Sequence, residues 1–455
     1  MMHYFILLIL IAFGQFAFAQ DVVMMDGNNP KEDAVYLKTV NGSTTIVDGH
    51  GHAINAHPVF KTDISERISR GWAKRVDRGG ESSASRGADA GPVFNITYLD
   101  IVNNTGKGFA DTQQGAQRRA TLEAAFLYFS NSIDNDGEVD IEIRESFEGS
   151  PASNPFAFAA SYYFGSVGFN RSFTQQHILT GSDPYPDFPD GYIQFNFHSG
   201  MNYYYSMHDS PTDQQFDFYT IALHEIMHLI GFTSYLDNAG NSEASPGVFT
   251  EFDGLLRDIN KNPLITISGS GQNAEVVGPV ASKLTNNQVW SEVETGDHAP
   301  VYSPPYFTGS SCDHFDNDRG SGSYVMHPSL KRGDAFKMLD AEEVRALSAL
   351  GYSTDMGMAT GLYDDFSPIE SIGDLFPNPA NKGMGIEINM GSHTGEEVLV
   401  IVFDMLGRES YSKVLVMKES GPIMAIDPYN NLAPGMYIVI GSTNDELFNQ
   451  KLVIR

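Results

Sequence analysis

Hydrophobic residues recur with regular spacing through the middle of the chain, between residues 92 and 352. Three segments alternate between hydrophobic and polar residues, which predicts β-strands at 93–99, 139–144 and 192–198. The apolar positions of 122–129 follow the i, i+3, i+4, i+7 spacing of one helical face. A second helix is predicted at 340–352, which has an Asp at its start and a Gly near its end. Strands and helices that alternate in this way predict an α/β or α+β domain.

The segments on either side of this middle part have a different character. Residues 20–91 are polar, rich in glycine and serine and poorly periodic, so we expect a propeptide or flexible leader there. Residues 353–373 also lack periodicity and are predicted to be a linker. Residues 374–455 consist of short alternating runs separated by turn residues, which predicts an all-β sandwich.

The N-terminal residues predict export from the cell. Residues 1–19 contain no Asp, Glu, Lys or Arg, and their apolar run leads to the small–x–small pattern Ala17-Phe18-Ala19. This pattern is typical of a signal peptide that is cleaved after Ala19. The apolar run is shorter than the roughly 20 residues that cross a bilayer. No second such segment follows, so no transmembrane anchor is expected.

Charge and cysteine content narrow the classes of partner and site. The chain carries 28 Lys and Arg against 57 Asp and Glu, a formal net charge of −29. Nucleic acids and anionic membranes attract basic surfaces, so no nucleic-acid partner is expected. Cys312 is the one cysteine of the chain, which excludes an intrachain disulfide framework and a metal site built from several cysteines.

One apolar segment carries the candidate chemistry. It predicts a helix that is apolar on nearly every side, with Asp217 as its N-cap and Gly231 as its stop. His224 and His228 are four residues apart, so both project from one helical face and can bind one zinc ion. Glu225 lies beside them and can act as general base on the attacking water. A zinc ion also explains ionisable side chains on an apolar helix, where burial without partners costs several kcal/mol.

The segment follows the pattern His-Glu-x-x-His-x-x-Gly-Phe, which resembles the zinc-binding sequence of the metzincin metallopeptidases. The common metzincin pattern has a third His three residues after the glycine, but this chain has Ser234 there. The leishmanolysin-like family of the clan interrupts the pattern with an insertion and supplies its third His shortly before a methionine turn. The chain resembles that family because His314 precedes Met326 at a similar separation.

This resemblance covers roughly residues 92–352 and has consequences for fold and site. It implies an α+β metzincin-type catalytic domain with a twisted, mostly parallel sheet and a zinc helix. It also implies an insertion at about 233–312, with His314 as the third zinc ligand and Met326 in a turn beneath the metal. Zinc accepts either histidine or carboxylate, so three rival third ligands stay open: His298, His327 and Glu251. A glutamate in this position would make the site thermolysin-like.

The resemblance also suggests where substrate binds. In metzincins an edge strand above the cleft pairs with extended substrate, and the strand at 192–198 is our candidate. Tyr192, Gln194 and Asn196 are therefore expected to bind the substrate.

A second cofactor candidate is calcium. Four neighbouring residues offer the oxygen ligands that calcium prefers: Asp313, Asp316, Asn317 and Asp318. Their spacing matches no EF-hand loop, so a solvated acidic loop is the competing interpretation.

The C-terminal segment has a resemblance of its own. Four motifs occur in the order found in the sorting domain of type IX secretion substrates, at 376–379, 400–408, 432–437 and 451–455. The resemblance implies a partner in the type IX secretion machinery and passage across the outer membrane of a didermal bacterium. The protein is then expected to be secreted or held on the outer cell surface.

Taken together, the sequence predicts a secreted zinc-dependent endopeptidase that acts on protein or peptide substrates. The alternative is a cell-surface adhesin on a catalytically inactive metzincin scaffold, in which zinc would be structural. An adhesin has no need of a general base, so Glu225 between His224 and His228 favours the enzyme.

Overall fold

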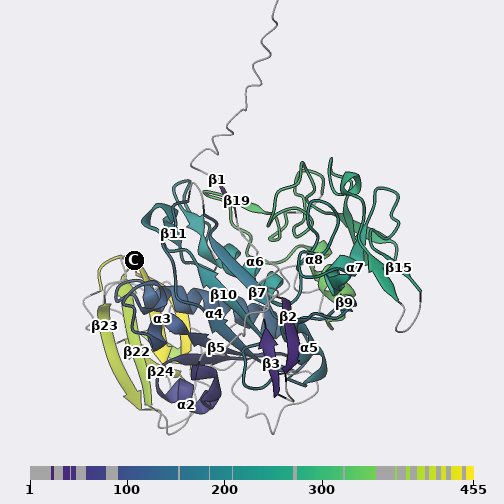
Figure 1. Cartoon of the computed structure of the whole chain (residues 1–455). Coiled ribbons are helices and arrows are strands. Elements are labelled where there is room, and N and C mark those ends of the chain that lie inside the picture. Colours follow the sequence, from purple (N-terminus) through teal and green to yellow (C-terminus); the bar gives the residue numbers. More distant parts are fainter. Residues whose placement is uncertain are drawn as a thin grey trace, which may run out of the picture. The chain divides into compact units, whose positions relative to one another are not determined.

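The computed structural model describes two compact units (Figure 1). The described residues of the first unit are 22–24, 34–40, 43–47, 58–77, 91–151, 154–183, 185–207, 209–269, 274–320 and 323–354. Those of the second are 375–376, 386–389, 397–404, 409–416, 422–426, 432–442 and 447–454. The expected signal peptide at 1–19 lies outside the described residues, as does the expected linker from residue 355 onward.

A five-stranded sheet with the order β4-β5-β6-β10-β7 forms the centre of the first unit. Its strands are β4 Ala73–Val76, β5 Val93–Tyr98, β6 Glu138–Ile143, β10 Gly191–Phe195 and β7 Ala157–Ser161. The three middle strands run parallel to one another. Both edge strands, β4 and β7, pair antiparallel with their neighbours. The sheet is therefore parallel in its middle and antiparallel at both edges.

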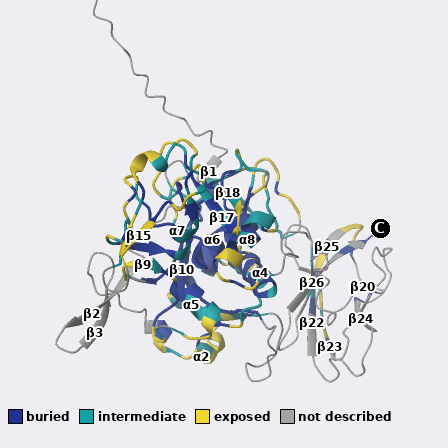
Figure 2. Ribbon diagram, turned by 90° about the vertical axis from the view of Figure 1, so that its right-hand side faces the viewer, coloured by how far each residue is buried: buried dark blue, intermediate teal, exposed yellow. Residues whose placement is uncertain are grey.

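Helices cover this sheet and bury its side chains. β5 is buried at all six of its residues, as expected for a strand covered on both faces. α4 (Gly115–Ser132) and α6 (Phe218–Leu229) pack against each other, and α6 also contacts β7 and β10. α5 (Phe173–Thr180) contacts β6. Figure 2 shows α6 and β10 among the buried elements at the middle of the unit.

The regular patterns of the sequence correspond to observed elements. β5, β6 and β10 confirm the three predicted strands, and α4 confirms the helix at 122–129. α8 (Ala341–Ala349) confirms the helix at 340–352 and begins with a capping box between Asp340 and Glu343. The two edge strands β4 and β7 were not predicted.

Residues 58–77 are folded, although the sequence placed them in a flexible leader. They form the 3₁₀ helix η1 (Pro58–Lys61), α2 (Ile64–Ser69) and the edge strand β4. Arg67 of α2 is 2% exposed. Its guanidinium donates hydrogen bonds to Thr97 Oγ1 at 2.8 Å and to the two Asp140 carboxylate oxygens at 3.0 and 2.8 Å. The expectation of a flexible leader is therefore wrong for 58–77, because one buried arginine joins this segment to β5 and β6.

Earlier residues of the expected leader also pair with the first unit. β1 (Val22–Met24) runs antiparallel to β19 (Ser329–Lys331). β2 (Ala34–Val40) pairs with β3 (Ser43–Val47) and runs parallel to β8 (Tyr163–Phe164). That this part is a propeptide stays a prediction.

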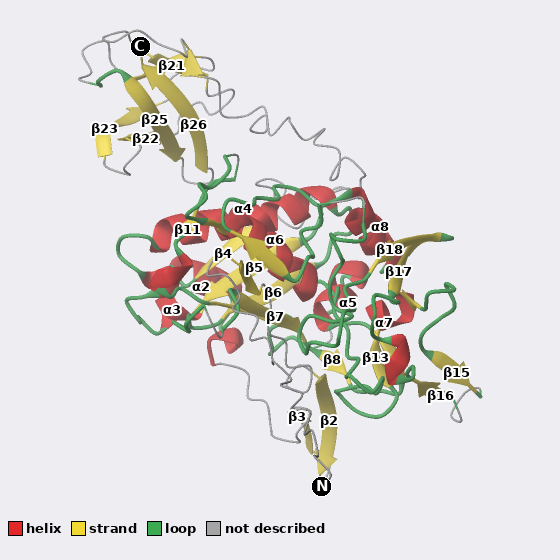
Figure 3. Cartoon of the chain, turned by 90° about the horizontal axis from the view of Figure 1, so that it is seen from above, coloured by secondary structure: helices red, strands yellow, loops and turns green. Residues whose placement is uncertain are grey.

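The expected insertion at 233–312 forms small elements of its own. β13 (Val248–Thr250) pairs with β9 (Gly168–Asn170) and leads into α7 (Glu251–Leu255). A three-stranded sheet consists of β14 Leu256–Arg257, β17 Trp290–Glu294 and β18 Asp297–Pro300. The hairpin of β15 (Thr266–Ser268) and β16 (Glu275–Val277) extends away from the central sheet (Figure 3). The remaining short elements are α3 Leu99–Val102, η2 Gly108–Ala110, η3 Ser199–Met201, β11 Tyr203–Tyr204, β12 Phe216–Asp217 and η5 Ala281–Lys283.

The second unit consists of strands in its described part. β20 (Leu375–Phe376), β21 (Ile386–Asn389) and β24 (Pro422–Ile426) form one antiparallel sheet. The other sheet has the order β23-β22-β25-β26, with strands Glu409–Val416, Glu397–Asp404, Gly435–Ser442 and Leu447–Ile454. Buried residues of both sheets, such as Ile386 and Val402, belong to one hydrophobic cluster. The two-layer sandwich stays a prediction.

If residues 58–77 are an integral part of the fold, Arg67→Met will destabilise the first unit. The substitution leaves the Asp140 carboxylate without its buried partner, and we expect the free energy of unfolding to fall by about 2–3 kcal/mol. This is less than for a fully buried pair, because the Asp140 side chain is 24% exposed. Denaturant titration followed by tryptophan fluorescence measures it, since Trp72 and Trp290 both lie in this unit.

Arg70→Met is the matched control. Arg70 ends the same helix and pairs with Glu66, but the two side chains are 49% and 48% exposed. Its loss is expected to cost less than about 1 kcal/mol. Equal effects of the two substitutions would show that α2 is not anchored through Arg67.

Candidate metal centre

α6 carries two of the predicted ligands and is fixed at both ends by its own sequence. Asp217 Oδ1 accepts hydrogen bonds from the Thr220 N–H at 2.7 Å and from the Thr220 hydroxyl at 2.8 Å, which confirms the predicted N-cap. The helix ends at Leu229, and Gly231 adopts a φ of +106°, where a side chain would be strained. Every residue of α6 is buried, so the histidines and the glutamate of this helix lie in the interior.

Three histidine side chains converge at this helix. The Nε2 atom of His224 lies 3.1 Å from that of His228 and 3.2 Å from that of His314. The Nε2 atoms of His228 and His314 are 3.3 Å apart, although 86 residues separate them in the sequence. A tetrahedral zinc ion at about 2.0–2.1 Å from each nitrogen separates its ligand nitrogens by roughly 3.3 Å. The structure therefore brings the three predicted ligands together at the spacing that one zinc ion requires.

The second nitrogen of each ring fixes its tautomer. Nδ1 of His224 lies 2.8 Å from the Val325 carbonyl oxygen, and Nδ1 of His228 lies 2.7 Å from that of Phe232. Nδ1 of His314 lies 2.9 Å from the Ser310 carbonyl oxygen. A carbonyl oxygen only accepts hydrogen bonds, so each Nδ1 carries the proton and each Nε2 presents a lone pair.

These lone pairs meet in a dry environment. All three histidines are 0% exposed. Burial lowers the pKa of His228 to about 4 and holds the pKa values of His224 and His314 well below their usual range. Three neutral rings thus direct acceptor nitrogens at one another with no proton between them, an arrangement that a cation stabilises. The donor set fits zinc, which is bound by neutral imidazole nitrogens.

The turn that contains Met326 supports two of these ligands. Met326 is buried, and its carbonyl oxygen accepts a hydrogen bond of 2.8 Å from the N–H of Phe315, the neighbour of His314. The preceding carbonyl, Val325, accepts the hydrogen bond from His224. A role for Met326 as the methionine of a metzincin turn stays a prediction.

Ser234 occupies the position of the usual third histidine and helps to hold the actual candidate. Its hydroxyl donates a hydrogen bond of 2.6 Å to Asp253 Oδ1, and its N–H donates to the Asp313 carboxylate. Burial raises the pKa of Asp253 to about 6, although hydrogen bonds from Ser234, Thr250 and other donors lower it. Because Asp313 directly precedes His314, these contacts tie the two ends of the insertion together beside the site.

The structure corrects the predicted substrate strand. β10, which carries Tyr192 and Gln194, pairs with β6 on one side and β7 on the other, so no further strand can add to it. The side chains are also engaged within the protein. Tyr192 lies under the Arg144 guanidinium, Gln194 donates to the Glu145 carbonyl at 2.8 Å, and Asn196, beyond the strand, donates to the Gly149 carbonyl at 2.9 Å. Assigning substrate binding to this strand as an edge strand was wrong.

The edge of the sheet on this side is β7. The sequence from 156 to 161, Phe-Ala-Phe-Ala-Ala-Ser, is rich in alanine, so the contrast between the two faces of the strand is too weak to reveal it. β7 contacts α6, which places this edge strand beside the helix of the histidine cluster.

The rival ligands lie outside the cluster. Among the described residues the grouped potential ligands at α6 are His224, His228 and His314 alone. Glu251 accepts hydrogen bonds from Arg171 at 3.0 Å and Gln175 at 3.0 Å. His298 lies on β18, and Nδ1 of His327 is 3.0 Å from the Ser329 carbonyl oxygen.

The acidic loop after the cluster already uses its oxygens. Asp316 Oδ2 accepts a hydrogen bond of 2.8 Å from Arg319, and Asn317 Oδ1 accepts one of 2.9 Å from the Tyr324 N–H. Asp313 accepts from Ser234. These contacts engage side-chain oxygens of three of the four residues, and calcium stays an untested prediction.

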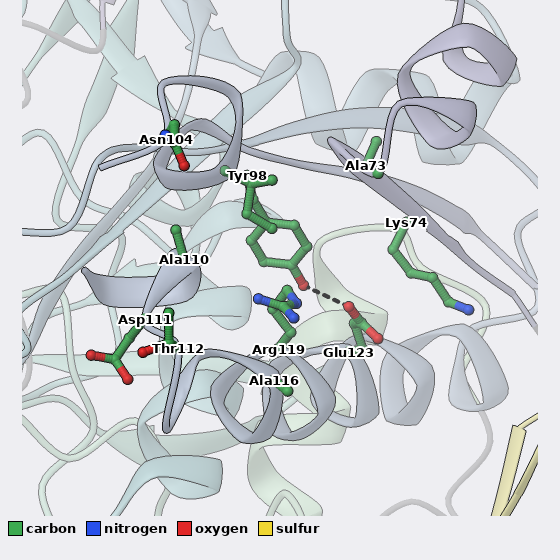
Figure 4. A pocket seen from close by; sticks show the side chains of 12 residues that line it. Ala73, Lys74, Tyr98, Asn104, Ala110, Asp111, Thr112, Ala116, Arg119 and Glu123 are labelled. Carbon is green, nitrogen blue, oxygen red and sulfur yellow. Dashed lines mark hydrogen bonds between the residues drawn. The ribbon is translucent and has the colours of Figure 1, made fainter. Parts of the chain in front are cut away.

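Two other polar features lie elsewhere in the first unit. Nδ1 of His177 is 3.1 Å from Asp190 Oδ2, near Asp183. Burial lowers the pKa of His177, but the hydrogen bond and charge of Asp190 raise it by more, as expected for an ion pair. Figure 4 shows a pocket of about 560 Å³ in which the Tyr98 hydroxyl donates to Glu123 at 2.9 Å. Its lining includes none of the three clustered histidines.

Comparison with known proteins identifies the C-terminal unit. Residues 374–455 match the family described as the secretion system C-terminal sorting domain. This confirms the predicted type IX sorting domain, so the protein is secreted or displayed on the cell surface and has the secretion machinery as a partner. No helix among the described residues is both long and apolar enough to cross a membrane.

The remaining comparisons add no functional argument. No curated protein matches the chain. One similar solved structure is PorZ, described as an essential bacterial surface component of the type-IX secretion system of human oral-microbiomic Porphyromonas gingivalis. It is 18% identical, with a TM-score of 0.15, and the match covers 42% of this chain and 25% of the PorZ chain.

His314→Ala tests the ligand set. It removes one of three nitrogen donors, so we expect zinc affinity to fall by more than about 100-fold, beyond the effect of losing an outer contact. Competition with a chromophoric chelator measures the dissociation constant. His298→Ala and His327→Ala are the matched controls and are expected to stay within about threefold of wild type. Loss of zinc in either control, with His314→Ala unaffected, would overturn the assignment.

Proposed function

We propose that this chain is a secreted zinc-dependent endopeptidase. The observation that supports it most is the convergence of three buried histidine Nε2 atoms, 3.1–3.3 Å apart, with Glu225 on the same helix. A metal centre of a purely structural kind has its coordination positions filled by protein ligands. Three protein ligands leave a fourth position for water, which is typical of catalytic zinc sites.

Each residue has a separate role in the proposed reaction. His224, His228 and His314 would hold the zinc ion, which supplies Lewis-acid chemistry when bound. Glu225 follows His224 directly on α6, and its carboxylate would accept a proton from the attacking water and return it to the leaving amine. Glu225 is 0% exposed, so this proton transfer would take place away from bulk solvent.

β7 is the proposed substrate-binding strand. Within the described sheet it pairs with β10 alone, so its other edge is our candidate for hydrogen bonds to an extended peptide. Its contact with α6 would bring a paired peptide close to Glu225. Main-chain pairing of this kind depends little on side chains, which suits an endopeptidase that acts on unfolded protein segments.

The assay follows from the fold. The chain should be prepared without its first 19 residues and, in a second form, without residues 20–57. Trimming should go no further, because residues 58–77 contribute β4 and the Arg67 contacts to the central sheet. Casein is a suitable unfolded substrate.

Glu225→Gln is expected to lower casein hydrolysis by about 10²–10⁴-fold while zinc content stays at the wild-type level. The amide keeps the shape of the side chain but cannot accept the proton. Removing zinc with a chelator should abolish hydrolysis and resupply should restore it. Glu251→Gln, which makes the same change on α7 outside the histidine cluster, is the control and should retain activity within about twofold.

One result would contradict the proposal. If a folded, zinc-loaded wild-type chain without residues 20–57 left varied unfolded substrates intact, the zinc centre would be structural. A cell-surface binding protein on an inactive scaffold would then become the better interpretation.

A further inference from the structure

A buried carboxylate lies beneath the turn that contains Met326. Glu343, the third residue of α8, is 0% exposed. Its Oε1 atom accepts a hydrogen bond of 2.6 Å from the Met326 N–H, and its Oε2 atom accepts one of 2.7 Å from the Asp340 N–H. The second bond belongs to the capping box of α8, but the first reaches a different segment of the chain.

The peptide group between Val325 and Met326 joins this carboxylate to a metal-binding histidine. Its N–H donates to Glu343, and its carbonyl oxygen accepts the 2.8 Å hydrogen bond from Nδ1 of His224. Resonance couples the two ends of a peptide group. A negative charge at the N–H end therefore increases the electron density on the carbonyl oxygen, which becomes a stronger acceptor.

We propose that Glu343 is a positioning residue that orients His224 and raises its basicity through the peptide group of Val325 and Met326. The arrangement has the chemistry of a carboxylate–histidine–metal triad, in which an acceptor on one ring nitrogen strengthens the donor power of the other. Here one peptide group stands between the carboxylate and the ring. This inference rests on the proposed zinc centre and adds a residue that touches neither metal nor substrate.

The same turn links Glu343 to a second ligand. The Met326 carbonyl oxygen accepts the hydrogen bond from the Phe315 N–H, next to His314. Fixing the Met326 N–H therefore also fixes the segment that presents His314. His224 and His314 therefore both depend on a turn whose Met326 N–H is held by Glu343.

Burial favours the neutral form of this carboxyl group. It raises the pKa of Glu343 to about 8, although the Met326 and Asp340 N–H groups lower it. Measurements of the effect are therefore best made above pH 8, where the carboxylate is ionised.

The test compares the zinc affinity of wild type and variants in a chain from which only the first 19 residues are removed. Glu343→Gln keeps the size of the side chain and removes its charge, and we expect the zinc dissociation constant to rise by about 10–100-fold. With cobalt in place of zinc, the visible absorption bands of the bound ion should shift, because they report the donor strength and orientation of the ligands. Neither readout requires peptidase activity.

Two further variants separate this role from support of α8. Asp340→Ala removes the N-cap side chain, which accepts the Glu342 N–H at 3.0 Å, and leaves the Glu343 contact to Met326 in place. We expect it to lower stability by about 1 kcal/mol and to change zinc affinity by less than about threefold. Glu343→Asp retains the charge on a shorter side chain and should lose less zinc affinity than Glu343→Gln. If Glu343→Gln does not fold, a modest loss of zinc affinity in Glu343→Asp that exceeds the loss in Asp340→Ala supports the proposal.

The outcomes distinguish this inference from the proposed function. Wild-type zinc affinity in Glu343→Gln with unchanged cobalt bands would overturn the role of Glu343 while the zinc centre stands. Equal losses in Glu343→Gln and Asp340→Ala would also overturn it, because the effect would then come from α8 alone. A wild-type chain that binds no zinc would refute the metal centre itself.

Discussion

The site depends on the burial of three neutral imidazole rings whose lone pairs face one another. Such a cluster is stable only if each ring has a fixed acceptor for its N–H proton, since an unsatisfied buried donor costs about 1–3 kcal/mol. The acceptors are carbonyl groups of Val325, Phe232 and Ser310, which belong to three separate segments. The end of α6, the end of the insertion and the turn before β19 must therefore be placed together.

The rest of the first unit provides that placement. α6 is anchored on the central sheet through β7 and β10, which sets the positions of His224 and His228. Ser234, held between Asp253 and Asp313, closes the insertion so that His314 returns to the helix. Glu343 accepts a hydrogen bond from the Met326 N–H and so holds the turn whose Val325 carbonyl contacts His224. The contacts of Ser234 and of the Met326 N–H use buried carboxylates, whose high desolvation cost favours pairing with fixed hydrogen-bond donors.

The protein that contains this buried histidine cluster is exported from the cytoplasm. The C-terminal unit is a secretion sorting domain, and the chain therefore works outside the cytoplasm. Its one cysteine, Cys312, is buried and free, so the first unit has no disulfide to limit its unfolding. The hydrogen bond from His224 to the Val325 carbonyl, and the Arg67 contacts that join residues 58–77 to the sheet, connect distant segments instead.

The sequence alone determined the elements whose signals are local. The apolar run with its Asp217 cap and Gly231 stop specified α6 and the relative positions of His224 and His228, because helix periodicity and capping act within a few residues. Ordered motifs identified the sorting domain, and a resemblance pointed to His314. Only the tertiary structure decided which strands lie at the sheet edges, that 58–77 belongs to the fold, and that Asp253 and Glu343 support the site. Those features arise from pairing between segments far apart in the chain, and a hydrophobic pattern records burial but not the identity of the neighbour.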